Sequence, residues 1–167
     1  MALTALFAAL TATATAFIKI NTGINEGYIH FGDSIIYLGA CILPLPYACL
    51  AAAIGGSIAD LLSGAAVWAP ITAVIKALNV LPFAVMYSAK ITKNPNKIVN
   101  KATAAMPVFS GIITVFGYLV AESLMYNFAS ALTSVPFSII QAVGSATLFW
   151  LLGALLDRIN FKNRLFK

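Results

Sequence analysis

Apolar residues are grouped along the chain into six long segments, which are separated by short breaks. Each segment ends at Gly, Pro, Asn or a charged residue, and these residue types commonly end helices. The pattern predicts an all-α fold with six helices, at about residues 3–18, 34–45, 47–62, 69–89, 106–128 and 135–156. The second and third are short, because a hydrocarbon core of ~30 Å takes about 20 helical residues to cross.

The break between the second and third segments has two interpretations. The sequence Leu43-Pro44-Leu45-Pro46 is either a tight connection between two helices or a kink within one span, because proline interrupts helices in both settings. The hydrophobic pattern alone is therefore consistent with six transmembrane helices and with five.

The composition places these helices in a membrane. Hydrophobic residues make up 61% of the chain and charged residues only 9%, with a mean hydropathy of +0.94. These values lie far outside the range of soluble domains. We expect one integral membrane domain over residues 1–167.

The distribution of cations favours six spans. Eight of the ten lysines and arginines occupy two segments, one with Lys90, Lys93, Lys97 and Lys101, the other with Arg158, Lys162, Arg164 and Lys167. Cytoplasmic loops carry an excess of Lys and Arg, so both segments and both termini are expected in the cytoplasm. The loop 21–32, with Glu26 and no cation, is then outside. Orientation and anionic lipids account for the net charge of +5, and no nucleic-acid partner is implied.

The first apolar segment has a competing interpretation as a secretory signal peptide. Ala12-Thr13-Ala14 has the small residues of a cleavage site, but no Lys or Arg precedes the apolar run. A first transmembrane helix is therefore the favoured interpretation.

Three of the later segments carry polar stripes at helical spacing. They are Thr72/Lys76/Asn79, Tyr118/Glu122/Tyr126 and Ser134/Ser138/Gln141/Ser145. Residues three or four apart share a helix face, and with six spans Lys76 and Glu122 both lie ~10 Å below the outer surface. The inner halves of these helices are almost free of polar side chains. A blind outer pocket of this kind favours binding over conduction.

Lys76 and Glu122 need partners at this depth. A charge within the bilayer costs at least ~2.5–3.5 kcal/mol, so both side chains should face protein or water. One interpretation is a structural ion pair between them, and the other is that both also contact a ligand.

The outer loops supply candidate walls for the pocket. In residues 27–33, polar and apolar side chains alternate between two glycines. We expect this segment to be extended and to lie over the mouth of the pocket, with the Tyr28 and His30 side chains on the same side. His30 can instead be a structural residue, and Asp33 can cap the second helix. Trp68 can stack on a planar ring or anchor the membrane interface. Asp60 can cap a helix, accept a hydrogen bond from Lys76 or contact a ligand.

These patterns define one candidate substrate-binding set and no catalytic residue, metal site or cofactor. The set comprises Tyr28, His30, Asp60, Trp68, Lys76, Asn79, Tyr118, Glu122, Ser138 and Gln141.

Small residues at four-residue spacing mark two helices for close packing. The first helix has Ala5/Ala9 and Ala8/Ala12/Ala16, and the third has Ala51/Gly55/Ala59. Packing within the chain is expected for the third helix, whereas the first can face either the chain itself or another subunit.

Three blocks of sequence resemble a known family. GYIHFGDSIIYLGA, GGSIADLLSG and VWAPITAVIKAL are similar to the S components of energy-coupling factor (ECF) transporters, especially small members linked to vitamins and thiamine precursors. The resemblance implies a membrane-embedded protein that captures a vitamin-like molecule from outside and associates with a transmembrane coupling protein and two ATPases. It also implies that Ala8, Ala12 and Ala16 contact the coupling protein.

The resemblance further implies that this chain is not an enzyme, and it contains no GxxxxGK[ST] sequence for binding ATP. One alternative is a stand-alone secondary transporter in which Glu122 and Lys76 exchange a proton. A more distant one is an intramembrane hydrolase that pairs Ser57 or Ser63 with Lys76, although no motif positions these residues.

Overall fold

The computed structural model describes residues 1–167 except 24, 26–27, 90, 92–94 and 166–167. Glu26, Gly27, Lys90, Lys93 and Lys167, which entered the sequence predictions, therefore lie outside the described residues. The helices in chain order are α1 (Ala2–Phe17), α2 (Asp33–Ile42), α3 (Leu45–Leu62), the short 3-10 helix η1 (Ala66–Trp68), α4 (Ala69–Leu78), α5 (Leu81–Ser88), α6 (Lys101–Met125), α7 (Phe128–Arg158) and α8 (Phe161–Leu165).

Four apolar helical runs among the described residues are long enough to cross a membrane. They are Leu45–Leu62, Ala66–Ser88, Lys101–Met125 and Phe128–Arg158, while Ala2–Phe17 and Asp33–Ile42 are apolar but shorter. Large apolar side chains point outward from these helices, including Leu124 at 83% exposure. An outward apolar surface of this kind is suited to contact with lipid. The chain is therefore an all-α membrane protein. The number of helices that cross the membrane stays a prediction.

The break after the second predicted helix is a connection between two helices. The second helix ends at Ile42, Leu43 is extended, and the third helix begins at Leu45 directly after Pro44. The backbone between Ile42 and Leu45 is thus not continued as one kinked helix.

The segment predicted as one helix over 69–89 is divided into α4 and α5 at Asn79 and Val80. Pro82 occupies the second position of α5. A proline ring clashes with the carbonyl four residues earlier, which here belongs to Leu78. The division therefore falls where the proline requires it.

Two other helices begin earlier than hydrophobicity alone predicts. Asn100 accepts hydrogen bonds from the N–H groups of Ala102 and Thr103 and starts α6 at Lys101, five residues before the predicted boundary. Asn127 accepts from the N–H of Ser130 and starts α7 at Phe128. Asparagine caps orphaned N–H groups at a helix start, so polar residues before the apolar run join the helix.

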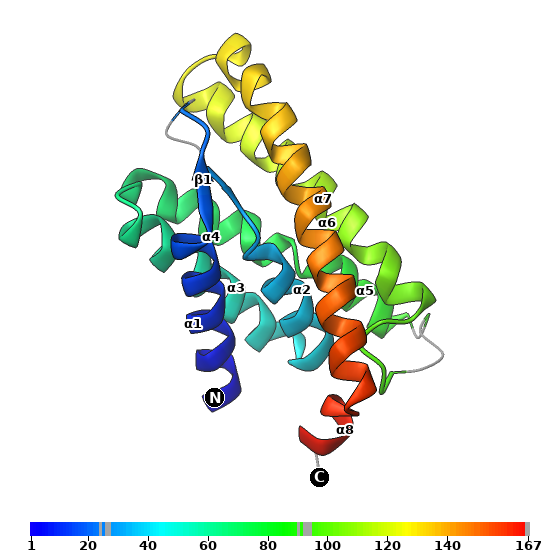
Figure 1. Ribbon diagram of the computed structural model, residues 1–167. Coiled ribbons are helices and arrows are strands. Elements are labelled where there is room, and N and C mark those ends of the chain that lie inside the picture. Colours follow the sequence, from blue (N-terminus) through cyan, green and yellow to red (C-terminus); the bar gives the residue numbers. More distant parts are fainter. Residues whose placement is uncertain (24, 26–27, 90, 92–94, 166–167) are drawn as a thin grey trace.

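The long helices form a closed ring. α1 packs on α3, α3 on α4, α4 on α6, α6 on α7, α7 on α2, and α2 returns to α1 and α3. Figure 1 shows α6 and α7 as the longest, antiparallel pair, with α8 and the start of α1 at the same end of the bundle. A small antiparallel hairpin of β1 (Lys19–Asn21) and β2 (Tyr28–His30) lies toward the other end, where Ile20 pairs with Ile29.

An aromatic cluster fills the ring toward the α8 end. Tyr37, Phe83 and Phe149 are fully buried, with ring centroids 5.6–6.0 Å apart. Ile98, Phe161 and other apolar side chains complete this core. Aromatic groups in tilted or offset contact make a dense apolar filling, so this cluster separates the hairpin end of the ring from a second hollow, which Tyr87 and Lys162 line near α8.

The alanine stripe of α1 is used inside the chain, which corrects the predicted partner interface. Ala8 and Ala12 are buried, and a Cβ built on Gly55 of α3 would lie 2.7 Å from the Ala8 carbonyl oxygen. The small residues thus let α1 and α3 approach closely. Ala16 is half-buried, whereas Ala9, which lies beside this stripe on α1, is exposed.

Candidate functional site

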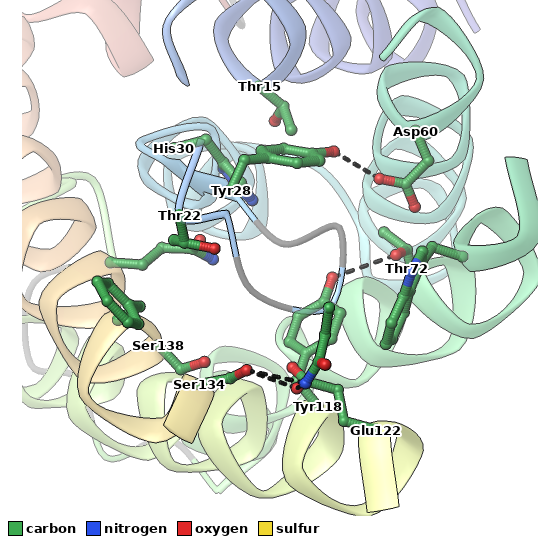
Figure 2. A pocket seen from close by; sticks show the side chains of 14 residues that line it. Thr15, Thr22, Tyr28, His30, Asp60, Thr72, Tyr118, Glu122, Ser134 and Ser138 are labelled. Carbon is green, nitrogen blue, oxygen red and sulfur yellow. Dashed lines mark hydrogen bonds between the residues drawn. The ribbon is translucent and has the colours of Figure 1, made fainter. Parts of the chain in front are cut away.

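A cavity of about 640 Å³, including the part that opens to solvent, lies inside the ring at the hairpin end. Polar and aromatic side chains from α1, the hairpin, α3, η1, α4, α6 and α7 converge on it, as Figure 2 shows. The lining residues are Thr15, Thr22, Asn25, Tyr28, His30, Asp60, Trp68, Thr72, Tyr118, Glu122, Ser134, Phe137, Ser138 and Gln141.

Eight of the ten residues in the predicted substrate-binding set lie in this wall, and Lys76 and Asn79 do not. Thr72 and Ser134 belong to the predicted polar stripes and also line the cavity. Thr15, Thr22, Asn25 and Phe137 were missed. Threonine and phenylalanine are ordinary residues in membrane helices, and Asn25 lies in a turn, so no periodicity singles them out.

Lys76 pairs with Asp33, so the interpretation in which Lys76 and Glu122 form an ion pair is wrong. The Lys76 Nζ lies 2.7 Å from Asp33 Oδ1, and both side chains are at most 1% exposed. Gln141 Nε2 donates to the other oxygen of Asp33 at 3.1 Å. The suggested capping role of Asp33 is also wrong, because Gly32 is the N-cap of α2 and no side chain caps it.

Two glycines make room for this buried pair. A Cβ on Gly32 would lie 1.9 Å from Thr15 Oγ1, and a Cβ on Gly56 would lie 2.9 Å from Lys76 Cγ. Only a residue without a side chain lets these backbones approach so closely. Gly32 therefore seats the start of α2 against α1, and Gly56 lets the Lys76 stem run along α3 toward Asp33.

Asn79 joins helices below the cavity. Its side-chain Nδ2 donates to Thr114 Oγ1 at 2.8 Å, and its backbone carbonyl oxygen accepts from Ser110 Oγ at 2.7 Å. Both partners are on α6, so Ser110 satisfies a backbone carbonyl at the α4–α5 division. Its predicted place in the pocket wall is not observed.

Asp60 receives a hydrogen bond from the hairpin. Tyr28 Oη donates to Asp60 Oδ1 at 2.5 Å (Figure 2), and burial together with the neighbouring carboxylate raises the pKa of Tyr28. The second oxygen, Asp60 Oδ2, is buried without a hydrogen-bond partner among the described residues. A buried acceptor left unpaired is costly, and this oxygen belongs to a side chain in the cavity wall.

Trp68 lies inside the chain, which removes its alternative as an interfacial anchor. It is 7% exposed and packs against Tyr118 and Tyr126, with centroids 6.1 and 6.3 Å away. Its indole N–H is buried and has no acceptor among the described residues. Thr72 and Tyr118 share a hydrogen bond of 3.2 Å beside it.

Glu122 holds the hairpin connection against α7. Its Oε2 accepts from Asn25 Nδ2 and from Ser134 Oγ, both at 2.6 Å. Ser130 Oγ donates to Asn25 Oδ1 at 2.7 Å. Asn25 adopts a left-handed backbone conformation, with φ 50°, which asparagine tolerates better than most residues. One turn residue thus joins the hairpin to α6 and α7.

His30 is neutral at ordinary pH. It is buried, and burial, aided by the positive charge of Lys76, lowers its pKa to about 3. The N–H of Gly32 donates to His30 Nδ1 at 3.1 Å, which leaves the proton on Nε2. His30 therefore presents one N–H donor in the cavity wall.

The arrangement suits binding more than chemistry. The described residues contain no group of three or more His, Cys, Asp or Glu side chains that could hold a metal ion. Lys76 is held by Asp33, and Ser57 Oγ donates to the Ala69 carbonyl at 2.9 Å, so a Ser57–Lys76 nucleophile pair is not formed. The direct contact between Lys76 and Glu122 that proton exchange would use is also not formed.

The model of the family described as "ECF-type riboflavin transporter, S component" matches residues 1–158. The chain belongs to this ECF S-component family. The S component is also similar to a Pyrococcus woesei protein described as an uncharacterized protein in the gap 3' region. The two are 29% identical over 150 residues, which cover 90% of this chain and 95% of the relative. The family is one of vitamin transporters, so the substrate-binding subunit of such a transporter is the functional class of this chain.

Removing one partner of the Asp33–Lys76 pair should destabilise the S component strongly. Lys76→Met leaves Asp33 charged and unpaired, at an expected cost of about 3–5 kcal/mol in the free energy of unfolding. Adding Asp33→Asn should restore most of the loss, because the buried charge is then gone. Thermal unfolding in detergent measures this, with exposed Lys101→Met as control. Equal stability of the single and double variants would contradict the coupling.

Acid should destabilise the S component through His30. Its pKa is about 3 when folded against an ordinary 6.5, so between these values the unfolded chain binds a proton that the native chain does not. The free energy of unfolding therefore keeps its full contribution from His30 above about pH 6.5. Below that pH it falls by about 1.4 kcal/mol per pH unit until the folded-state pKa is reached. His30→Asn, which keeps an acceptor for the Gly32 N–H, should lose about 2 kcal/mol less than the wild type by about pH 5. Parallel pH profiles of the unfolding temperature would contradict this assignment.

Proposed function

We propose that this chain captures a small vitamin or vitamin precursor in the cavity, from outside the cell. A transmembrane coupling protein and two ATPase subunits would then drive its uptake, and ATP hydrolysis would take place in those partners. The observation that carries this proposal is a polar cavity at the hairpin end of the ring, separated from the other end by an apolar aromatic cluster.

The cavity is closed below. The Asp33–Lys76 pair and Gln141 lie at its base, and the cluster of Tyr37, Phe83 and Phe149 fills the ring toward the other end. A conducting pore or a proton path needs polar groups that continue to the opposite face. A closed cup instead suits a protein that binds its substrate and releases it after a conformational change.

The basic segments support an outward-facing cavity. Asp157 near the end of α7 accepts from the N–H groups of Ile98 and Val99, and Lys162 of α8 donates to the Pro95 carbonyl. The two cation-rich segments therefore meet at the end of the bundle away from the hairpin. Because such segments stay in the cytoplasm, we place both termini there and the cavity outside.

The contact with the coupling protein is proposed for the exposed face of α1. Ala8 and Ala12 are buried inside the chain, whereas Ala2, Ala5 and Ala9 of this helix are exposed. A flat, small-residue surface permits the close helix approach that membrane interfaces use. Reorientation of the bundle along α1 would then deliver the captured molecule.

Uptake by the reconstituted complex tests the proposal. The chain, coexpressed with a coupling protein and its ATPases, should accumulate a vitamin in vesicles only with ATP, and a ligand identified by mass spectrometry should copurify with the chain. Uptake by the chain alone that an uncoupler abolishes would contradict this and favour the secondary transporter.

Added bulk on α1 should separate coupling from binding. Ala9→Leu places a larger side chain on the exposed face and is expected to reduce copurification with the coupling protein several-fold. Ligand-induced stabilisation, which follows ln(1 + [L]/Kd), should not change. Ala154→Leu on an exposed face of α7 is the matched control. Unchanged recovery of the complex with Ala9→Leu would remove α1 from the interface.

A further inference from the structure

The described wall of the cavity contains two acidic side chains and no Lys or Arg. The two acids are Asp60 and Glu122. Lys76 lies nearby but is neutralised by Asp33. Lys19 Nζ lies 4.9 Å from the centroid of the Tyr28 ring and belongs to a separate hollow outside the hairpin.

Both acids accept hydrogen bonds from polar side chains. Asp60 accepts from the Tyr28 hydroxyl, and Glu122 accepts from an amide and from a hydroxyl. Each of these partners donates to the carboxylate, and hydrogen bonds donated to a carboxylate stabilise its anion. Two anions in a partly closed apolar bundle are unfavourable unless a positive group enters.

Two buried polar atoms of the wall lack partners in the described part of the chain. Asp60 Oδ2 is an unused acceptor, and Trp68 Nε1 is an unused donor. Both side chains are more than nine-tenths buried and line the cavity. Buried polar groups are nearly always hydrogen-bonded, so an occupant with at least one N–H donor and one acceptor would satisfy them.

The remaining wall is aromatic. Trp68 and Tyr118 are tilted against each other with centroids 6.1 Å apart. Tyr28 and His30 lie together on another side of the cavity, with centroids 5.6 Å apart (Figure 2). Aromatic faces bind flat rings by stacking, and they attract cations through the negative charge of the ring face. The carboxylates and the rings therefore select the same kind of molecule.

From this combination we infer that the ligand is a flat nitrogen heterocycle that carries a positive charge. The inference rests on the proposed function, since it names the substrate class of the same cavity. Asp60 binds the N–H groups of the ligand, Glu122 contributes a second negative charge, and Trp68 and Tyr118 contact the ring. Riboflavin, which gives the family model its name, is uncharged at neutral pH and lacks this feature.

Matched pairs of water-soluble compounds test the charge directly. Pyridoxamine is a cation near neutral pH and pyridoxine is its neutral hydroxyl analogue. Nicotinamide and its N-methyl cation form a second pair, and thiamine and riboflavin are added as a cationic and a neutral vitamin. Binding to the purified chain is measured by calorimetry and thermal shift. At least one cation should bind, with a Kd roughly tenfold to hundredfold below that of its neutral counterpart.

Two isosteric variants assign the preference to the acids. Asp60→Asn and Glu122→Gln keep an oxygen that accepts the hydrogen bonds from Tyr28 and Asn25, so the fold should be retained. Each should remove most of the preference for the cation. Asp157→Asn, which neutralises a carboxylate at the far end of the bundle, is the control and should leave the preference unchanged.

The outcomes separate this inference from the proposed function. Equal or tighter binding of the neutral compounds, abolished by Trp68→Leu, would overturn the charge inference and leave capture at this cavity intact. A copurified neutral or anionic ligand would do the same. If no compound binds and no ligand copurifies, both the inference and the proposed function fail.

Discussion

The buried ion pair between Asp33 and Lys76 determines much of the rest of the structure. An ammonium group inside an apolar bundle must be neutralised, and here the partner comes from α2, while Gln141 of α7 satisfies the second carboxylate oxygen. Three helices are thereby fixed around one point at the base of the cavity. Glu122 is consequently free to hold Asn25 of the hairpin connection, and the cavity wall keeps its acidic character.

Helical periodicity was sufficient to predict where the polar residues gather. Tyr118 and Glu122 share one face of a helix, and so do Ser138 and Gln141 on the next helix. The predicted threading placed both pairs at the same depth in the membrane, and all four residues line the cavity. The partner of Lys76 could not be predicted in this way, because Asp33 lies outside the three polar stripes and also fits a helix cap. Pairing between distant segments depends on how the ring closes, and no local pattern encodes that.

Other differences had readable local signals. Pro82 indicates the α4–α5 division, and Asn100 indicates the early start of α6. Helix boundaries drawn from the apolar segments alone miss both signals. The alanine spacing of α1 is ambiguous by nature, since small residues permit close approach to any helix. Ala8 and Ala12 are buried, and Ala8 lies close to Gly55, so these two residues pack inside the chain and the exposed side of α1 is left for a partner.

A ligand-bound structure of the purified chain in lipid nanodiscs tests the central claim most directly. The account predicts density for a flat molecule beside Trp68 and Tyr118, with a ligand nitrogen within hydrogen-bond distance of Asp60 Oδ2 and the Asp33–Lys76 pair intact beneath it. Density for the ligand outside the ring, or a Lys76 side chain that has left Asp33 to contact the ligand or Glu122, would contradict it.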